Sequence, residues 1–277
     1  MKFFIRSVFF LILFFIIFYF YAGIVEPMLL MVKYENIYSN LIVNENIKIV
    51  QFSDVHISEF FDLEYLKKTV KKINDENPHI VVFTGDLIDE YNKYKRKENI
   101  NEIGKVLGEI HAPFGKYAVY GNHDYGGGAE RVFRKVMEDS GFKLLLNERV
   151  YLKEYNISII GMDDSIFGRF EKEVIASYLD ENSFNIILSH EPDVAEYFFE
   201  HNLDLFISGH SHGGQINLPF INYNPPLAKK YVRGMYVIDN FRRTKIYVNV
   251  GLGTSQIPMR FMAPPELTVF NLYGMDE

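Results

Sequence analysis

The sequence predicts an α/β protein in which two sheets pack as a sandwich flanked by helices, with one apolar helix in front. Three observations lead to this fold class. Strand-like and helical patterns alternate through the earlier part of the chain, whereas the last part, from residue 231, shows strands separated by turns. Five polar stretches each follow an apolar, strand-like run. An uncharged apolar segment lies near the N-terminus.

The apolar segment, residues 7–25, carries no charge and ends at Glu26. Roughly 20 apolar residues in a helix cross the core of a bilayer. The alternative is a cleaved signal peptide, but its apolar part is usually only about 7–15 residues long, and no small-x-small cleavage site follows. We therefore expect residues 1–26 to be a retained single-pass anchor in the cell membrane. Lys2 and Arg6 precede the segment, so the positive-inside rule predicts a cytoplasmic N-terminus and an extracytoplasmic location for the rest of the chain.

The strands of the domain follow from apolar runs and turn residues. Residues 27–46 are polar and mixed, and we expect a linker or a strand that leads into a domain of residues 47–277. Residues 47–53 alternate and then become apolar, which is typical of a central strand. Further strands are predicted at residues 79–84, 117–120, 142–152, 157–161, 185–188, 205–208, 231–238, 245–250 and 267–270.

The helices follow from apolar residues at helical spacing. Leu63, Leu66 and Val70 lie on one face of a helix over residues 62–75, which Pro78 ends. A second helix ends at residue 110. The others are predicted at residues 130–140, 170–179 and 193–200.

The composition argues against several functions. The net charge of −7 and the pI of about 5.7 argue against a nucleic-acid partner, which would require a basic surface. The chain has no cysteine, so disulfides, thiolate catalysis and cysteine zinc sites are excluded. Five of the eight histidines lie in the polar stretches: His56, His123, His190, His210 and His212. Histidines scattered through the core or the surface would not cluster in this way.

The polar stretches together offer a set of metal ligands. Each stretch alone is typical of a polar turn, but all five follow strands, whose carboxyl ends meet at one edge of an α/β sheet. Oxygen and nitrogen donors without sulfur suit manganese, iron or zinc. They are too many for one tetrahedral zinc and fit two metals that share a carboxylate. The donors are Asp54, His56, Asp86, Asn122, His190, His210 and His212.

These stretches resemble the five blocks of the calcineurin-like metallophosphoesterase superfamily. The blocks are Asp54-x-His56, Gly85-Asp86, Gly121-Asn122-His123-Asp124, His190 and Gly209-His210-Ser211-His212. The resemblance covers nearly all of the chain after residue 47. Residues 209–219, 251–253 and 258–267 further resemble a bacterial, membrane-anchored, single-domain branch. Some members of that branch are assigned to hydrolysis of UDP-2,3-diacylglucosamine in lipid A synthesis.

The resemblance implies a four-layer α/β/β/α sandwich with two divalent metal ions. A phosphodiester or pyrophosphate bond would be hydrolysed by in-line attack of a metal-bound hydroxide. His123 would act as general acid or charge stabiliser, oriented by Asp124. Asp54, His56 and His212 would hold one metal, Asp86 would bridge both, and Asn122, His190 and His210 would hold the other.

The substrate must be specified outside these blocks. Arg260 is a candidate phosphate contact because its guanidinium offers a planar fork of donors. Aromatic residues and methionines in residues 217–226 and 257–264 either line a groove for a lipid or sugar or pack beneath the C-terminal strands. A nucleotide sugar is made in the cytoplasm, which conflicts with the predicted topology. A metal-stabilised scaffold without turnover and a nucleotide phosphodiesterase are the alternative functions.

Overall fold

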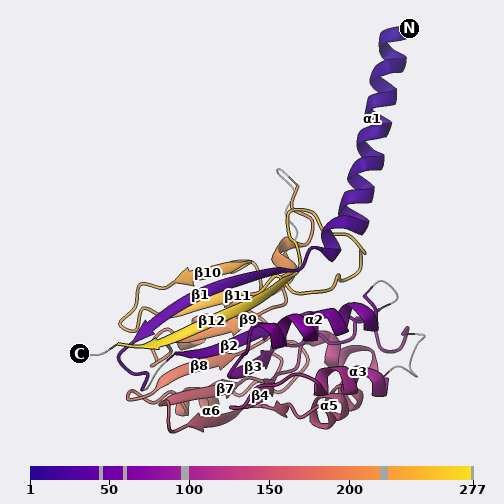
Figure 1. The fold of residues 1–277 in the computed structure, drawn as a ribbon. Helices are drawn as coiled ribbons and strands as arrows, with labels where there is room; N and C mark the ends of the chain where they lie inside the picture. Colours follow the sequence, from indigo (N-terminus) through magenta and orange to yellow (C-terminus); the bar gives the residue numbers. More distant parts are fainter. Residues whose placement is uncertain (44–45, 59–60, 95–99, 219–223, 276–277) are drawn as a thin grey trace.

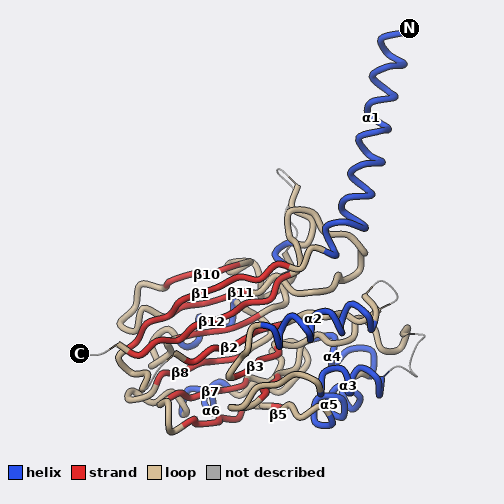
Figure 2. The backbone as a smooth tube through the Cα atoms, in the orientation of Figure 1, coloured by secondary structure: helices blue, strands red, loops and turns tan. Residues whose placement is uncertain are grey.

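The protein is a four-layer sandwich with a single helix projecting from one end (Figure 1). The computed structural model describes residues 1–277 except 44–45, 59–60, 95–99, 219–223 and 276–277. Two six-stranded sheets face each other, and helices lie outside them (Figure 2). Ile49 and Val82 of one sheet and Ile159, Ile186 and Ile207 of the other are buried in the same hydrophobic cluster between the sheets. The predicted α/β/β/α arrangement is confirmed.

The first sheet joins both ends of the chain to the central strands. β1 and β12 are parallel to each other, and β12 is antiparallel to β2. β2, β3, β4 and β5 are parallel. The region expected to be a linker or leading strand therefore contains the edge strand β1. In spatial order the strands are β1 (Met31–Ser39), β12 (Glu266–Gly274), β2 (Ile47–Phe52), β3 (Ile80–Phe83), β4 (Lys116–Ala118) and β5 (Lys143–Leu144).

The second sheet has a parallel centre and two antiparallel edges. β11, β9, β8 and β7 are parallel, whereas β10 and β6 are antiparallel to their neighbours. The predicted stretch 142–152 is divided between the two sheets, because β5 belongs to the first and β6 to the second. In spatial order the strands are β10 (Gly234–Val237), β11 (Lys245–Val248), β9 (Leu205–Ser208), β8 (Phe184–Leu188), β7 (Ile157–Gly161) and β6 (Glu148–Leu152).

The outer layers are made of short amphipathic helices. α2 (Leu63–Asp75) begins where the Asp62 carboxylate accepts the Tyr65 N–H at 3.1 Å. With α3 (Ile100–Gly108) and α5 (Glu130–Asp139) it buries apolar side chains against the first sheet. α6 (Lys172–Ser177) and the 3-10 helix η5 (Asp193–Phe198) bury theirs against the second. Both are shorter than the predicted helices 170–179 and 193–200, and η5 is not α-helical.

The N-terminal helix stands apart from the sandwich (Figure 1). α1 (Lys2–Phe20) has no buried residue, and it continues through a π-helical turn, η1 (Tyr21–Val25), into the 3-10 turn η2 (Glu26–Met28). Its length and apolar composition would let it cross a membrane, and a signal sequence would pass the same test.

The base of this helix, in contrast, is built into the domain. Ala22 and Glu26 are buried. The Arg260 N–H donates to the Ala22 carbonyl at 2.8 Å, and the Ala263 N–H donates to Glu26 Oε1 at 2.6 Å. The Phe18 and Phe261 rings lie 4.9 Å apart between centroids. Residues at the two ends of the chain therefore form one contact region.

Candidate metal centre

Five polar stretches meet at the carboxyl ends of the central strands. β2, β3 and β4 are parallel in one sheet, and β8 and β9 are parallel in the other, so their following loops share one rim. Several of the residues there adopt left-handed backbone conformations, which non-glycine residues rarely do and which often mark functional sites. Those with φ between 44° and 69° are Asp54, His56, Asp86, His210 and His212.

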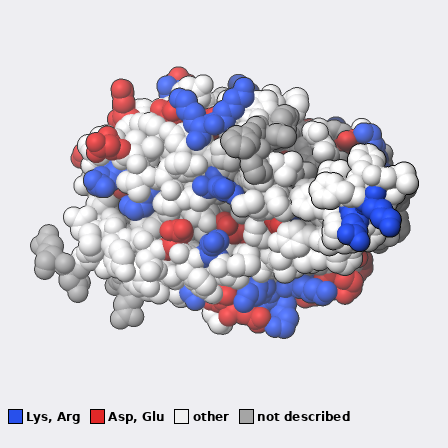
Figure 3. All heavy atoms as spheres, turned by 90° about the horizontal axis from the view of Figure 1, so that it is seen from above, with Lys and Arg blue, Asp and Glu red and all other residues white. Residues whose placement is uncertain are grey.

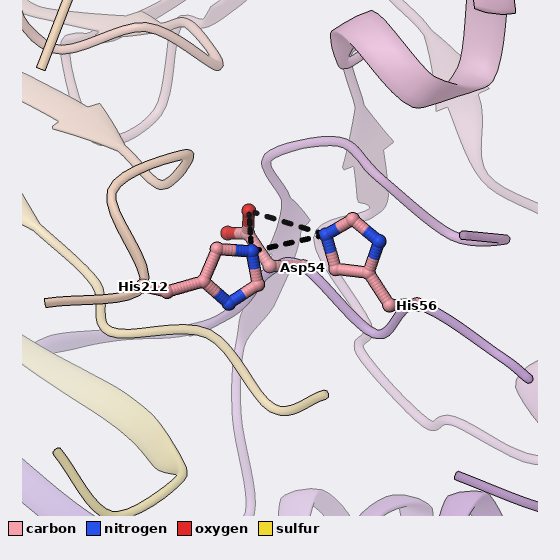
Figure 4. Close-up of side chains that lie close together, drawn as sticks. All are labelled: Asp54, His56 and His212. Carbon is pink, nitrogen blue, oxygen red and sulfur yellow. Dashed lines mark hydrogen bonds and ion pairs between the residues drawn. The ribbon is translucent and has the colours of Figure 1, made fainter. Parts of the chain in front are cut away.

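The first cluster consists of Asp54, His56 and His212 (Figure 4). The two imidazole Nε2 atoms lie 3.0 Å apart, and Asp54 Oδ1 lies 3.5 Å from His212 Nε2 and 4.0 Å from His56 Nε2. All three residues are buried. Burial, and secondarily the nearby His56, lowers the pKa of His212 well below its ordinary value. A neutral imidazole nitrogen is the form that binds a metal.

The second cluster consists of Asp86, His190 and His210. His190 Nε2 lies 3.1 Å from Asp86 Oδ2 and 3.1 Å from His210 Nδ1. The other ring nitrogens face carbonyls, His190 Nδ1 at 2.7 Å from Thr84 O and His210 Nε2 at 2.9 Å from Pro226 O. Nitrogens that donate to carbonyls leave the opposite nitrogens as lone-pair donors. Burial is the main cause that lowers the pKa of His210 to about 4, so this ring is neutral at neutral pH.

The two clusters adjoin, and their donor set fits divalent metal ions. Asp86 Oδ2 also lies 3.4 Å from His56 Nε2, which places this carboxylate between the clusters. Asn122 begins α4 (Asn122–Tyr125), and its Oδ1 is buried with no hydrogen-bond partner among the described residues. A buried amide oxygen without a donor is costly unless something else occupies its lone pairs. Converging imidazole nitrogens and this unpaired oxygen are what a metal site requires.

The surroundings of His123 differ from the prediction. Asp124 was expected to orient it, but in the described part of the chain Asp124 makes no hydrogen bond to the His123 ring. Its carboxylate instead accepts the N–H groups of Asp86, Leu87 and Gly121 at 2.7–2.9 Å. His123 Nδ1 lies 2.5 Å from the carbonyl oxygen of Asp89. Asp124 therefore shapes the backbone around Asp86, because neighbouring amides converge on it.

Asp89 is the site residue that sequence reasoning missed. Its Oδ1 lies 3.1 Å from His56 Nδ1 and 3.6 Å from His123 Nδ1. It belongs to the loop after β3 that carries Asp86, and an acidic residue three positions after a candidate ligand was the available signal. Its contact with His56 is one of distance and charge, because His56 Nδ1 has no hydrogen-bond partner among the described residues.

Arg260 also departs from the expectation, because its donors are directed at the protein. The side chain is fully buried, and its guanidinium donates to the carbonyls of Val250, Gly253 and Ala263. Nη2 lies 3.5 Å from His212 Nδ1. Burial lowers its pKa to about 10, so the group stays charged at neutral pH. These contacts assign Arg260 to the support of the first cluster rather than to a phosphate.

The loop that Arg260 supports lies against the first cluster. The N–H of Gly253 donates to the Asp54 carbonyl at 2.7 Å. Gly251 has φ of +72°, and a Cβ there would lie 2.6 Å from the Asp54 Cβ, so a side chain would displace the ligand. The aromatic residues and methionines that were expected either to line a groove or to pack do not share one environment. Phe261 packs on the anchor and Met262 is exposed, whereas Phe220 and Tyr223 lie outside the described residues.

The fold and the rim of acidic and histidine ligands define a metal-dependent phosphoesterase. The Calcineurin-like phosphoesterase family model matches residues 47–214, and the chain belongs to this family. It is therefore a hydrolase, as its sequence blocks predicted.

Known proteins similar to this chain agree with the family. An uncharacterized metallophosphoesterase of Bacillus subtilis, YkuE, is 41% identical, covering 92% of this chain and 89% of the relative. The UDP-2,3-diacylglucosamine pyrophosphatase LpxG of Chlamydia muridarum is 28% identical, covering 80% and 82%. A dimetal phosphatase from Danio rerio has a similar fold, with a TM-score of 0.50 and 14% identity over 78% of this chain and 90% of that one.

Proposed function

We propose that this chain is a membrane-anchored, two-metal phosphoesterase that hydrolyses a phosphodiester or pyrophosphate bond. One observation carries the proposal: Asp86 lies between two histidine-containing clusters, within 3.4 Å of a ring nitrogen in each. A carboxylate shared in this way is typical of sites that hold two ions roughly 3.5–4 Å apart.

The ligands divide between the two ions. Asp86 would contact both. Bound divalent ions of this kind (manganese, iron or zinc) supply an activated water and neutralise the phosphoryl oxygens. Asp54, His56 and His212 would hold the first ion, and Asn122, His190 and His210 the second.

We assign His123 the role of assisting departure of the leaving group. Its Nδ1 is directed at the Asp89 carbonyl, so Nε2 remains the nitrogen that would protonate the leaving oxygen or stabilise its charge. The Asp89 carboxylate lies 3.6 Å from Nδ1 of the same ring. Asp124 acts indirectly, because its carboxylate accepts the backbone N–H of Asp86. The protein thus positions one proton donor beside the ligands without needing a covalent intermediate.

The membrane helix and the rim lie at the same end of the molecule. β1 begins after the helix and pairs in parallel with β12, whereas β2 runs opposite to β12. The carboxyl end of β2, which carries Asp54, is therefore the end nearest the anchor. This placement supports a substrate at the membrane surface, and we propose a lipid-linked phosphoester or a nucleotide sugar such as the UDP-2,3-diacylglucosamine that names the chlamydial relative.

Activity is tested with the full chain in detergent, because Ala22 and Glu26 are buried in the domain. Manganese-dependent hydrolysis of an aryl phosphodiester is compared with that of the matching monoester and with an Asp86→Asn variant. We expect turnover of the diester that requires metal and is lost in the variant. Metal binding without turnover of either ester would instead support a scaffold.

Topology is tested with single cysteines, because the natural chain has none. Glu200→Cys lies at an exposed position of the domain and Lys2→Cys at the start of the helix. In intact cells, a membrane-impermeant maleimide should label the first and spare the second if the domain is extracytoplasmic. The reverse pattern would place the domain in the cytoplasm, where a nucleotide sugar is available.

A further inference from the structure

A cavity of about 520 Å³ opens beside Asp89. Asp89, which contacts His56 and His123, lines one side of it together with Glu90 and Lys93. Ile257 and Pro258 line another side. The cavity therefore begins with charged groups at the catalytic rim and becomes apolar toward the loop that packs on the anchor.

A second cavity, of about 230 Å³, continues in that direction. Thr254 and Pro258 line both cavities, so the two lie on either side of or next to the same short segment. Its walls are mostly apolar and include Phe61 together with Ile24 and Met28 of the anchor base. We call the two cavities together the anchor-side groove.

The anchor-side groove reaches the apolar surface of the membrane helix. Ile24 lines the second cavity and also a shallow hollow along the helix, with Ile16, Tyr19 and Phe20. Figure 3 looks onto the end of the molecule from which α1 leaves, and uncharged residues make up most of this view, with acidic and basic residues interspersed in small groups. One end of the groove thus lies at Asp89, which contacts His56 and His123, and the other end lies at the base of α1.

We propose that the anchor-side groove binds a hydrocarbon chain of the substrate, which makes the substrate class a lipid phosphoester. This inference rests on the proposed function. The phosphoryl group would lie at the rim while the chain runs past Thr254 and Pro258 to the anchor base and into the membrane. Apolar walls favour hydrocarbon over water, and continuity with α1 lets the chain leave the groove without crossing solvent.

The first experiment compares two substrates that differ only in the chain. Methyl p-nitrophenyl phosphate and hexadecyl p-nitrophenyl phosphate have the same diester and the same leaving group. With the full chain in mixed micelles of an uncharged detergent and manganese, we expect kcat/KM to be at least tenfold higher for the hexadecyl ester. Equal values for the two esters would overturn the lipid assignment while leaving the phosphoesterase intact.

A bulky substitution in the groove distinguishes binding of the hexadecyl chain to the groove from simple partition of the ester into the micelle. Thr254 lines both cavities, and Thr254→Trp would fill space in them. We expect the hexadecyl preference, which is the ratio of the two kcat/KM values measured on the same protein, to fall to less than a third of its value in the parent chain. A preference that survives this substitution would show that the chain binds elsewhere.

A binding measurement keeps the inference testable even without turnover. Met28 and Met262 are each 60% exposed, but only Met28 lines the groove, so Met28→Cys and Met262→Cys are a matched pair. Hexadecyl methylphosphonate should slow maleimide labelling at position 28 severalfold and leave position 262 unchanged. Protection at both positions or at neither would overturn the groove, whereas protection at 28 without hydrolysis of any ester would overturn only the proposed function.

Discussion

The two ligand clusters share a rim but are held by different parts of the chain. In the first cluster, Asp54 lies against the loop of Gly251 and Gly253, and the Gly253 carbonyl accepts from Arg260. The Arg260 backbone N–H in turn donates to Ala22 at the anchor base. Support for these ligands thus comes from the N-terminal helix and the C-terminal loop.

The second cluster depends on the strand ends and the loops beside them. The Thr84 carbonyl fixes the His190 ring, and the Pro226 carbonyl fixes His210. Asp86 Oδ1 accepts the His123 N–H at 2.8 Å. The positions of the residues in the second cluster depend on the strand ends and their loops. Those in the first cluster also depend on contacts between the two ends of the chain.

Asp86→Asn should have the largest effect, because this carboxylate adjoins both clusters. We expect kcat for an aryl phosphodiester to fall by at least about 10³-fold, beyond the 10–100-fold typical of residues that only orient ligands. Bound manganese per chain should fall as well. Asp75→Asn, at an exposed site on α2, is the control. If the kcat of Asp86→Asn stayed within about tenfold of that of the parent chain, the bridging role of Asp86 would be contradicted.

His123→Asn should come next and should separate chemistry from metal binding. Loss of a proton donor lowers kcat by roughly 10²–10⁴-fold. Neither cluster should lose its metal, since His123 Nδ1 is directed at the Asp89 carbonyl. The measurement is metal content by elemental analysis beside kcat. A drop in metal content would make His123 a ligand instead.

Arg260→Ala should affect the first cluster more than the second. Removing the guanidinium leaves the carbonyls of Val250, Gly253 and Ala263 without these donors, so the loop against Asp54 should loosen. We expect metal affinity and kcat/KM to fall about 10–100-fold, with one weak and one unchanged manganese site in titration calorimetry.

Arg260→Lys tests whether charge alone suffices at this position. A lysine cannot reproduce the planar fork, so we expect only partial recovery of metal affinity. Equal weakening of both manganese sites in Arg260→Ala would contradict the separate support of the two clusters.

Glu26→Gln should have the smallest effect. Its Oε1 accepts the Ala263 N–H across the two ends of the chain, and glutamine keeps an acceptor but loses the charge. We expect the free energy of unfolding to fall by about 1 kcal/mol with unchanged metal content. Glu64→Gln, on the exposed surface of α2, is the control for denaturant unfolding. A shift no larger than that of the control would show that the anchor base adds little.

The clustering of most candidate metal ligands could be predicted because their positions follow from strand ends. Asp54, Asp86 and His190 each lie two or three residues after a buried strand, and parallel strands bring their carboxyl ends to one edge. The partners of Asp124 could not be predicted in this way. Its carboxylate could reach either a ring or backbone amides, and only the turn at Asp86 brings three N–H groups within reach.

The sequence by itself determined the apolar helix, the strand ends and the donor types, because these depend on local periodicity and on side-chain chemistry. The tertiary structure decided the support of the first cluster, the contact of Asp89 with His123, and the groove toward the anchor. The reason is distance along the chain: Glu26 and Ala263 are separated by 237 positions. Contacts of that separation leave no periodic pattern, and only the packing of the first sheet brings them together.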